Sequence, residues 1–268
     1  MTFLKVSALA LALTTALTAA GTAQAALTAG DIAIIGRTNN GAPDAFSFVA
    51  LSNISAGEVI YFTDNGWTGS GFRGASGTDG DGNENFTKWT ASANVAAGTI
   101  VASTSAGFAT SGAIPGVAVS GDNTFSSLDQ SQSGEQIYAF QNTNSSNPLF
   151  NLGTATQLYA LDDTNGFEGA TSTTTGGVPT GLTAGSTAVT LNFTGGNTIA
   201  VKASVLGGAA KTKQEWLTVF ADANNWATAT ALPTTSIAIS AVPEPTSGII
   251  ALAGLGVAGL VARRRRAA

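Results

Sequence analysis

The chain of 268 residues lacks two side chains on which enzymes most often depend. It has no cysteine, which excludes a disulfide framework, a thiolate metal site and a cysteine nucleophile. It has no histidine either, which removes the commonest general base and the commonest metal ligand, and with them every Ser-His-Asp triad. An enzyme made from this sequence would have to use carboxylates or a metal held by oxygen atoms. We therefore expect a protein that is not an enzyme.

Charged residues are also scarce, at 10% of the chain, and they are unevenly placed. Four of the eleven basic residues, Arg263, Arg264, Arg265 and Arg266, stand in a row near the C-terminus. Residues 26–241 carry six basic and fifteen acidic side chains, a net charge of about −9. This balance excludes nucleic acid as a partner, because phosphate binding needs a basic patch. It is compatible with divalent cations or with neutral polysaccharide.

Residues 1–25 have the pattern of a secretory signal peptide. Lys5 precedes a short apolar stretch, and Ala23 and Ala25 form an Ala-x-Ala cleavage site. We expect the secretion translocon to export the chain, with cleavage after Ala25. The alternative, an uncleaved membrane anchor, is disfavoured by the short apolar run and by the small residues at the cleavage position.

Residues 242–268 predict a second targeting segment. Residues 248–262 are apolar throughout. As a helix they would rise about 22 Å, against a hydrocarbon core about 30 Å thick. The arginines at 263–266 would remain on the cytoplasmic side, as positively charged flanks do. Pro243 and Pro245 keep the chain before this span extended, so a protease can reach it at the outer membrane face.

The motif Val242-Pro243-Glu244-Pro245, followed by an apolar helix and an arginine cluster, resembles the PEP-CTERM sorting signal of Gram-negative bacteria. The resemblance implies recognition by an exosortase, a membrane-embedded processing enzyme, and transient anchoring in the inner membrane. It also implies that the body is then released, or transferred to the cell envelope or an extracellular matrix. Proteins of this class are associated with exopolysaccharide and with biofilm formation. The alternative is an ordinary anchor with a chance Pro-Glu-Pro.

Residues 26–241 predict a single all-β domain. Short β-branched and aromatic runs bounded by turn residues favour a β-sandwich or a barrel, and we expect the sandwich. The expected strands are residues 31–36, 46–51, 58–63, 86–90, 99–103, 135–140, 157–161, 188–193, 198–202 and 236–240. Residues 212–223 predict one short helix that closes an end of the sandwich, with Trp216 and Phe220 on one face.

The first part of this body carries a second resemblance. Six segments of this part are similar, in their order, to exported bacterial proteins with a lamin-tail-like β-sandwich: Gly30 to Gly36, Phe46 to Val49, Gly57 to Thr63, Phe62 to Trp67, Thr87 to Thr90 and Ala97 to Ile100. The resemblance covers about residues 30–105. It implies a structural or adhesive module of the cell surface, and it supplies no catalytic residues.

The densest acidic loop is a candidate calcium site. Asp79, Asp81, Asn83 and Glu84 offer closely spaced oxygen atoms, and Ca²⁺ takes about six to eight oxygen ligands. The loop departs from the EF-hand pattern, because its sixth position is Glu84 instead of glycine and its twelfth is Thr90 instead of glutamate. We expect no cofactor, with calcium at this loop as the alternative to a solvated polar loop.

Two other functions stay open. The tryptophans can stack on sugar rings, which together with the acidic loop would make a calcium-dependent carbohydrate-binding module; they are Trp67, Trp89, Trp216 and Trp226. Asp162 and Asp163 with Glu168 are a candidate carboxylate pair for a polysaccharide hydrolase or lyase. The sequence Asp-Asp-Thr-Asn-Gly also favours a plain turn at this position.

Overall fold

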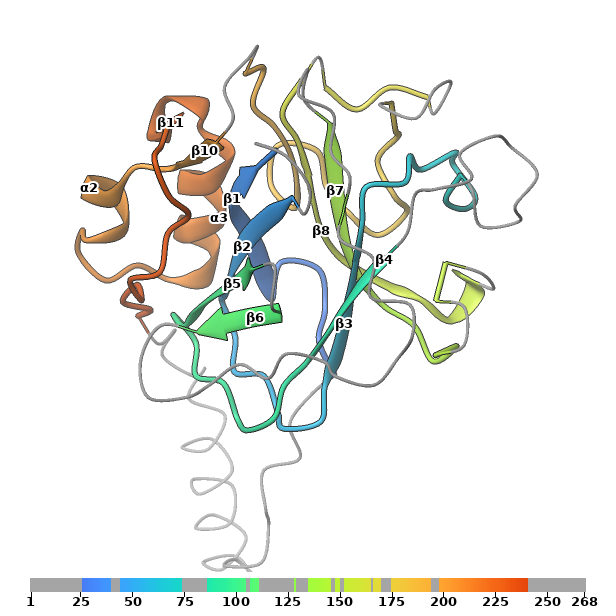
Figure 1. The fold of residues 1–268 in the computed structure, drawn as a ribbon, viewed down its shortest axis with the longest axis horizontal. Coiled ribbons are helices and arrows are strands. Elements are labelled where there is room, and N and C mark those ends of the chain that lie inside the picture. Colours follow the sequence, from blue (N-terminus) through green and yellow to red (C-terminus); the bar gives the residue numbers. More distant parts are fainter. Residues whose placement is uncertain are drawn as a thin grey trace, which may run out of the picture.

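A computed structural model describes residues 26–39, 44–73, 86–104, 107–110, 128, 135–145, 148–149, 152–164, 166–169, 175–193 and 198–240. In these residues two β-sheets pack against one another, with short helices beside them (Figure 1). The all-β sandwich expected from the sequence is confirmed. The predicted signal peptide and the predicted apolar helix over residues 248–262 lie outside the described residues.

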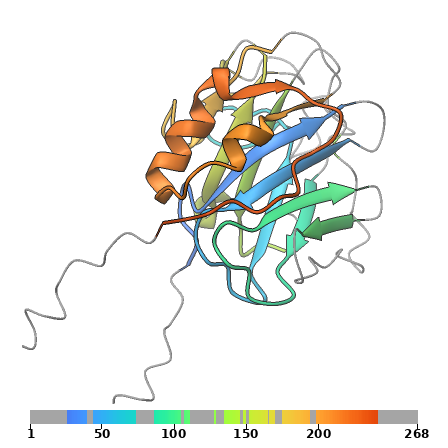
Figure 2. The same cartoon turned by 90° about the vertical axis from the view of Figure 1, so that its left-hand side faces the viewer.

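The first sheet has six strands, each antiparallel to its neighbours. In spatial order they are β11 (Trp226–Thr228), β10 (Thr198–Val201), β1 (Ile32–Thr38), β2 (Ala45–Ala50), β5 (Ile100–Thr104) and β6 (Gly107–Thr110). The chain after β11 crosses the outer face of this sheet (Figure 2). It passes so close to β1 that a Cβ atom added at Gly36 would lie 2.9 Å from Cδ of Pro233. β1 is therefore buried on both faces.

The second sheet has five strands. In spatial order they are β4 (Phe86–Thr90), β3 (Val59–Thr63), β7 (Gln136–Gln141), β8 (Thr156–Asp162) and β9 (Ala188–Thr190). β8 and β9 are parallel, and the other neighbours are antiparallel. The register of β7 against β8 shifts so that Leu158 is an extra residue, a β-bulge. The Leu158 carbonyl accepts a hydrogen bond of 2.8 Å from Gly30 N, which ties β8 to the segment before β1.

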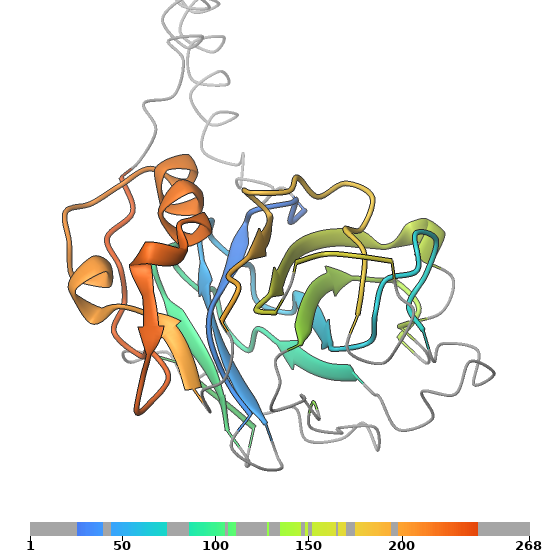
Figure 3. The same ribbon diagram turned by 90° about the horizontal axis from the view of Figure 1, so that it is seen from above.

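The main core lies between the sheets, which face one another in Figure 3. Phe46 and Phe48 from β2 meet Phe62 from β3 and Trp89 from β4, with ring centroids 4.5–5.3 Å apart. All four rings are at most 1% exposed. Burying each of them stabilises the fold by about 1.5–3 kcal/mol, so this cluster strongly favours the face-to-face packing.

A second apolar cluster covers the outer face of the five-stranded sheet. Tyr61, Tyr138 and Phe140 belong to this cluster, while their neighbours Phe62 and Ala139 belong to the main core. The cluster is completed by Trp67, Phe72 and Leu149, and by partly buried residues from loops between 152 and 182. The central strands of this sheet are therefore buried on both faces. This explains why they appear in the sequence as continuous apolar runs instead of alternating ones.

The helices follow β10. α2 (Ala203–Leu206) is a single turn, and α3 (Lys213–Ala221) begins with a capping box formed by Thr212 and Glu215. The 3₁₀ turns η1 (Leu152–Thr154) and η2 (Ala223–Asn225) complete the described helical elements. α3 contacts β1 and β9, one strand from each sheet, and so closes the sandwich on that side. The rings of Trp216 and Phe220 stack inside at 5.3 Å, as their spacing predicts.

Several details differ from the sequence-based expectation, among them the single turn α2, since the sequence predicted only one helix. β6 and β11 were not predicted, because Gly107–Thr110 and Trp226–Thr228 are too short to show an alternating pattern. The strand predicted over residues 236–240 is wrong. These residues form only an isolated bridge, between Ile239 and Lys211, and otherwise follow an irregular path over the first sheet.

Candidate functional site

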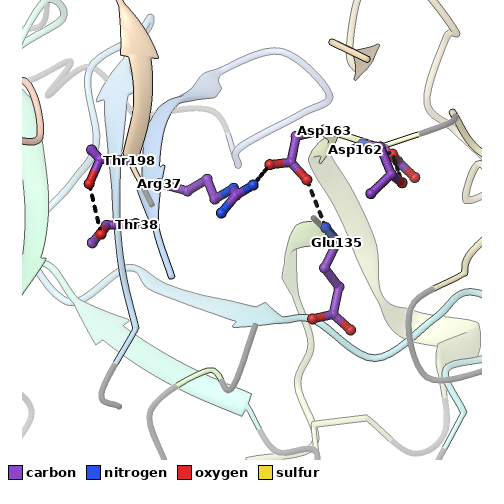
Figure 4. A network of polar contacts seen from close by, with 7 residues as sticks. Arg37, Thr38, Glu135, Asp162, Asp163 and Thr198 are labelled. Carbon is purple, nitrogen blue, oxygen red and sulfur yellow. Dashed lines mark hydrogen bonds and ion pairs between the residues drawn. The ribbon is translucent and has the colours of Figure 1, made fainter. Parts of the chain in front are cut away.

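One end of the sandwich brings together charged side chains from both sheets (Figure 4). Arg37 lies near the end of β1, and Asp163 directly follows β8. Their side chains, 3% and 0% exposed, form an ion pair between Nη2 and Oδ2 that crosses from one sheet to the other. Asp163 Oδ1 also accepts a hydrogen bond of 2.7 Å from Glu135 N, just before β7. Because an unpaired buried charge is costly, this pair favours one arrangement of the two sheets.

The electrostatics of this cluster point to a structural role. Burial lowers the pKa of Arg37 to about 10, and the charges of Asp44 and Glu135 partly counter that effect. The guanidinium therefore stays protonated at neutral pH. Its Nε and Nη1 atoms are buried and have no hydrogen-bond partner among the described residues. A charge held in this way can position neighbouring groups, but it cannot act as a general acid or base near pH 7.

The carboxylates considered for polysaccharide cleavage have different surroundings. Asp162 Oδ1 accepts hydrogen bonds of 2.9 Å from both N and Oγ1 of Thr164, which makes a local turn. Its side chain and that of Asp163 point in different directions (Figure 4). Glu168 is exposed, on a loop whose backbone is bonded to Gly176. Asp162 therefore forms the plain turn that the sequence offered as the alternative to a catalytic carboxylate pair.

The tryptophans considered for sugar stacking all lie in the interior. Their exposed fractions are 5% for Trp67, 0% for Trp89, 0% for Trp216 and 2% for Trp226. Trp216 Nε1 donates to the Ala238 carbonyl at 3.0 Å, and Trp226 Nε1 donates to the Phe220 carbonyl at 2.8 Å. Stacking on a carbohydrate needs an open aromatic face. The alternative in which one of these indoles stacks on a sugar therefore finds no exposed indole in the fold.

The other predicted site residues lie outside the described part of the chain. They are the sorting motif Val242, Pro243, Glu244 and Pro245, the arginines 263–266, the cleavage residues Ala23 and Ala25, and the calcium candidates Asp79, Asp81, Asn83 and Glu84. Within the described ranges, no group of three or more His, Cys, Asp and Glu side chains is arranged to hold a metal ion. Within the same ranges, no helix has the length and hydropathy that crossing a bilayer requires.

The reading of the sequence did not single out Arg37. A signal for it exists, because Arg37 is the only charged residue in the otherwise apolar run of β1. A charge in a strand that is buried on both faces needs a partner of opposite sign. The sequence gives no comparable signal for a buried Asp163, because the adjacent Asp162 is equally suited to a turn.

Comparison with known proteins identifies one segment of the chain. The family model of the PEP-CTERM protein-sorting motif matches residues 241–266. This agrees with the order of motif, apolar run and arginine cluster in the sequence. No curated protein and no solved structure matches the chain. The lamin-tail-like resemblance of residues 30–105 therefore stays a prediction.

Proposed function

For a chain that is exported and sorted by an exosortase, as its PEP-CTERM motif indicates, we propose a non-enzymatic structural or adhesive role. The mature body would act at the cell surface or in an extracellular polysaccharide matrix, after transient anchoring in the membrane. One observation carries this proposal. Among the described residues, Asp162, Asp163 and the four tryptophans, which the sequence offered for chemistry or sugar stacking, are already engaged in the fold itself.

These ion pairs, hydrogen bonds and buried rings stabilise the folded body. Asp163 is paired with Arg37 between the sheets, and Asp162 closes a turn. The indoles of Trp89 and Trp216 fill the main core, and Trp67 fills the outer cluster. A sandwich that uses its reactive and aromatic groups in this way is suited to rigidity and to display at a surface. The exosortase then determines where the body is delivered.

The experiment compares two forms of the full chain in a native host that lacks its own copy. One is the wild type and the other carries Pro243→Ala with Pro245→Ala. We expect the wild-type body in the envelope or matrix fraction, with restored cell aggregation, and the variant as a longer, membrane-retained species without restored aggregation. Normal aggregation in cells that lack the protein altogether would contradict the structural or adhesive role.

An enzymatic role is tested with the isolated chain. The host polysaccharide is incubated with the wild-type chain and with an Asp162→Asn variant, and its chain length is measured. Our proposal predicts no shortening with either. Shortening by the wild type that is lost in the variant would instead favour the hydrolase or lyase considered from the sequence.

A further inference from the structure

Residues 236–240, here called the strap, are the last described residues before the sorting motif. Backbone hydrogen bonds hold the strap at two points. Ile237 N donates to the Gly98 carbonyl at 2.9 Å, and Ser240 N donates to the Lys211 carbonyl at 2.8 Å. Between these points the Ala238 carbonyl accepts two bonds, from Lys211 N at 3.2 Å and from the indole of Trp216 at 3.0 Å. The strap is therefore bonded to Lys211, which precedes α3, and to Trp216 within α3.

The strap packs closely against the folded body. Ile237 is 6% exposed and belongs to the main core, and Ile239 packs against that core. Gly98 has a φ of +91°, and a Cβ atom there would overlap the Ile237 carbonyl, so the strap can approach this closely only over a glycine. Yet the strap is not a strand of either sheet, and its one bridge partner is Lys211. Segments held by few backbone bonds open locally at lower free energy than core strands.

The position of the strap limits how far the sorting motif stands from the folded body. Pro243 follows Ser240 by three residues, which reach at most about 10 Å when extended. The apolar run begins five residues after Pro243, at Gly248. The headgroup layer outside the hydrocarbon core is only about 5–8 Å thick. With the strap in place, Pro243 therefore lies within about 10 Å of Ser240, while the five residues after it can reach across the headgroup layer, so the folded body stays close to the motif that a membrane-embedded enzyme must take up.

We infer that the strap is a releasable tether, and that it must leave α3 before the exosortase can take the motif into its active site. Release frees residues 236–240 and adds about 17 Å of reach between body and motif. The hydrogen bonds of the strap with Lys211 and Trp216 then set the rate at which the exosortase processes the chain. This inference needs only the sorting of the chain and is independent of the surface role proposed above.

The absence of cysteine from the chain allows a direct test. Residues paired across a bridge lie about 5 Å apart at Cα, inside the range of about 4.4–6.8 Å that a disulfide spans. A variant with Lys211→Cys and Ile239→Cys would lock the strap in an oxidising compartment. Each single substitution is the matched control, because it removes the same side chain without forming a cross-link. Processing is followed in a host with its exosortase, by intact mass and by membrane fractionation.

We expect the cross-linked variant to remain full-length and membrane-bound while both single variants are processed like the wild type. Reductant should restore processing. A Gly-Ser linker of about six residues inserted between Ser240 and Ala241 should restore it with the disulfide intact, because the linker supplies the missing reach. Processing of the cross-linked variant at the wild-type rate would overturn the inference, and so would failure of the linker to rescue it.

A second variant tests the same inference if the double-cysteine chain does not fold. Trp216→Phe keeps an aromatic ring in the core but removes the indole donor to Ala238 O. We expect this variant to be processed faster than the wild type when exosortase is limiting. Trp226→Phe is the matched control, because it also removes one indole hydrogen bond, to Phe220 O, but leaves the strap untouched. Equal rates for the wild type and Trp216→Phe would contradict the inference.

Discussion

The Asp31 carboxylate oxygen Oδ1 lies 2.8 Å from Lys213 Nζ, although the two residues are 182 positions apart in the chain. Asp31 stands just before β1, and Lys213 is the first residue of α3. The same carboxylate accepts hydrogen bonds from Thr28 and Ser52. One side chain thus joins the start of the described body to the helix that holds its last residues.

Asp31 should make stability depend on acidity. Burial raises the pKa of Asp31, but the bonds from Lys213, Ser52 and Thr28 outweigh burial and hold that pKa below its ordinary value of 3.8. Its contribution is therefore complete above about pH 4 and is lost as the pH falls through the folded pKa. We expect Asp31→Asn to lower the free energy of unfolding by about 1–2 kcal/mol at pH 7, because Lys213 is partly exposed and screened. Urea unfolding at pH 7 and pH 3 measures this, and an equal loss at both pH values would contradict it.

The ion pair between Arg37 and Asp163 should contribute more to the free energy of unfolding than Asp31 does. Arg37→Met leaves the Asp163 carboxylate buried without its partner, and we expect a loss of about 3–5 kcal/mol in the free energy of unfolding. Adding Asp163→Asn removes the unpaired negative charge, while the amide oxygen of the asparagine can still accept the bond from Glu135 N. The double variant should therefore be more stable than Arg37→Met alone. Denaturant unfolding of the wild type, of Arg37→Met, of Asp163→Asn and of the double variant checks this, and additive losses would show that the two side chains are not coupled.

The outer aromatic cluster offers a test of close packing. Tyr138 donates its hydroxyl hydrogen to the Gly177 carbonyl at 3.0 Å, and a Cβ atom added at Gly176 would overlap that hydroxyl oxygen. Tyr138→Phe should cost about 1–2 kcal/mol, because it leaves a backbone carbonyl unpaired. Gly176→Ala should destabilise the wild type, and it should cost less in the Tyr138→Phe chain, where the hydroxyl is gone. A cost of Gly176→Ala that is the same in both chains would contradict this contact.

Calcium provides a further test, directed at the acidic loop that carries Asp79, Asp81, Asn83 and Glu84. Our proposal expects no cofactor, so the melting temperature should be the same in excess calcium and in excess chelator. A ligand that binds only the folded chain raises its stability. A calcium-dependent rise that disappears in Asp79→Asn with Asp81→Asn would favour the calcium-dependent module instead. Magnesium at the same concentration controls for ionic strength.

The sequence alone was sufficient for features that depend on local pattern. The order of Pro-Glu-Pro, apolar run and arginines is a linear signal, and the family comparison confirms it. The strands around Ile32–Thr38 and Val59–Thr63 follow from β-branched and aromatic runs, because such residues favour a pleated and buried surface. The spacing of Trp216 and Phe220 likewise predicts α3, since it acts within a single helical turn.

Only the tertiary structure decided what depends on which strands become neighbours. Arg37 and Asp163 form a pair because β1 packs against β8, and no local pattern encodes that approach. Packing between distant segments also buries the four tryptophans, which the sequence alone left available for sugar binding as an alternative to a place in the core. Residues 236–240 have the composition of a strand, yet their backbone bonds go to Gly98 and Lys211 instead of to a strand of either sheet. Propensity is a property of a few consecutive residues, whereas burial and pairing depend on contacts between segments far apart in the chain.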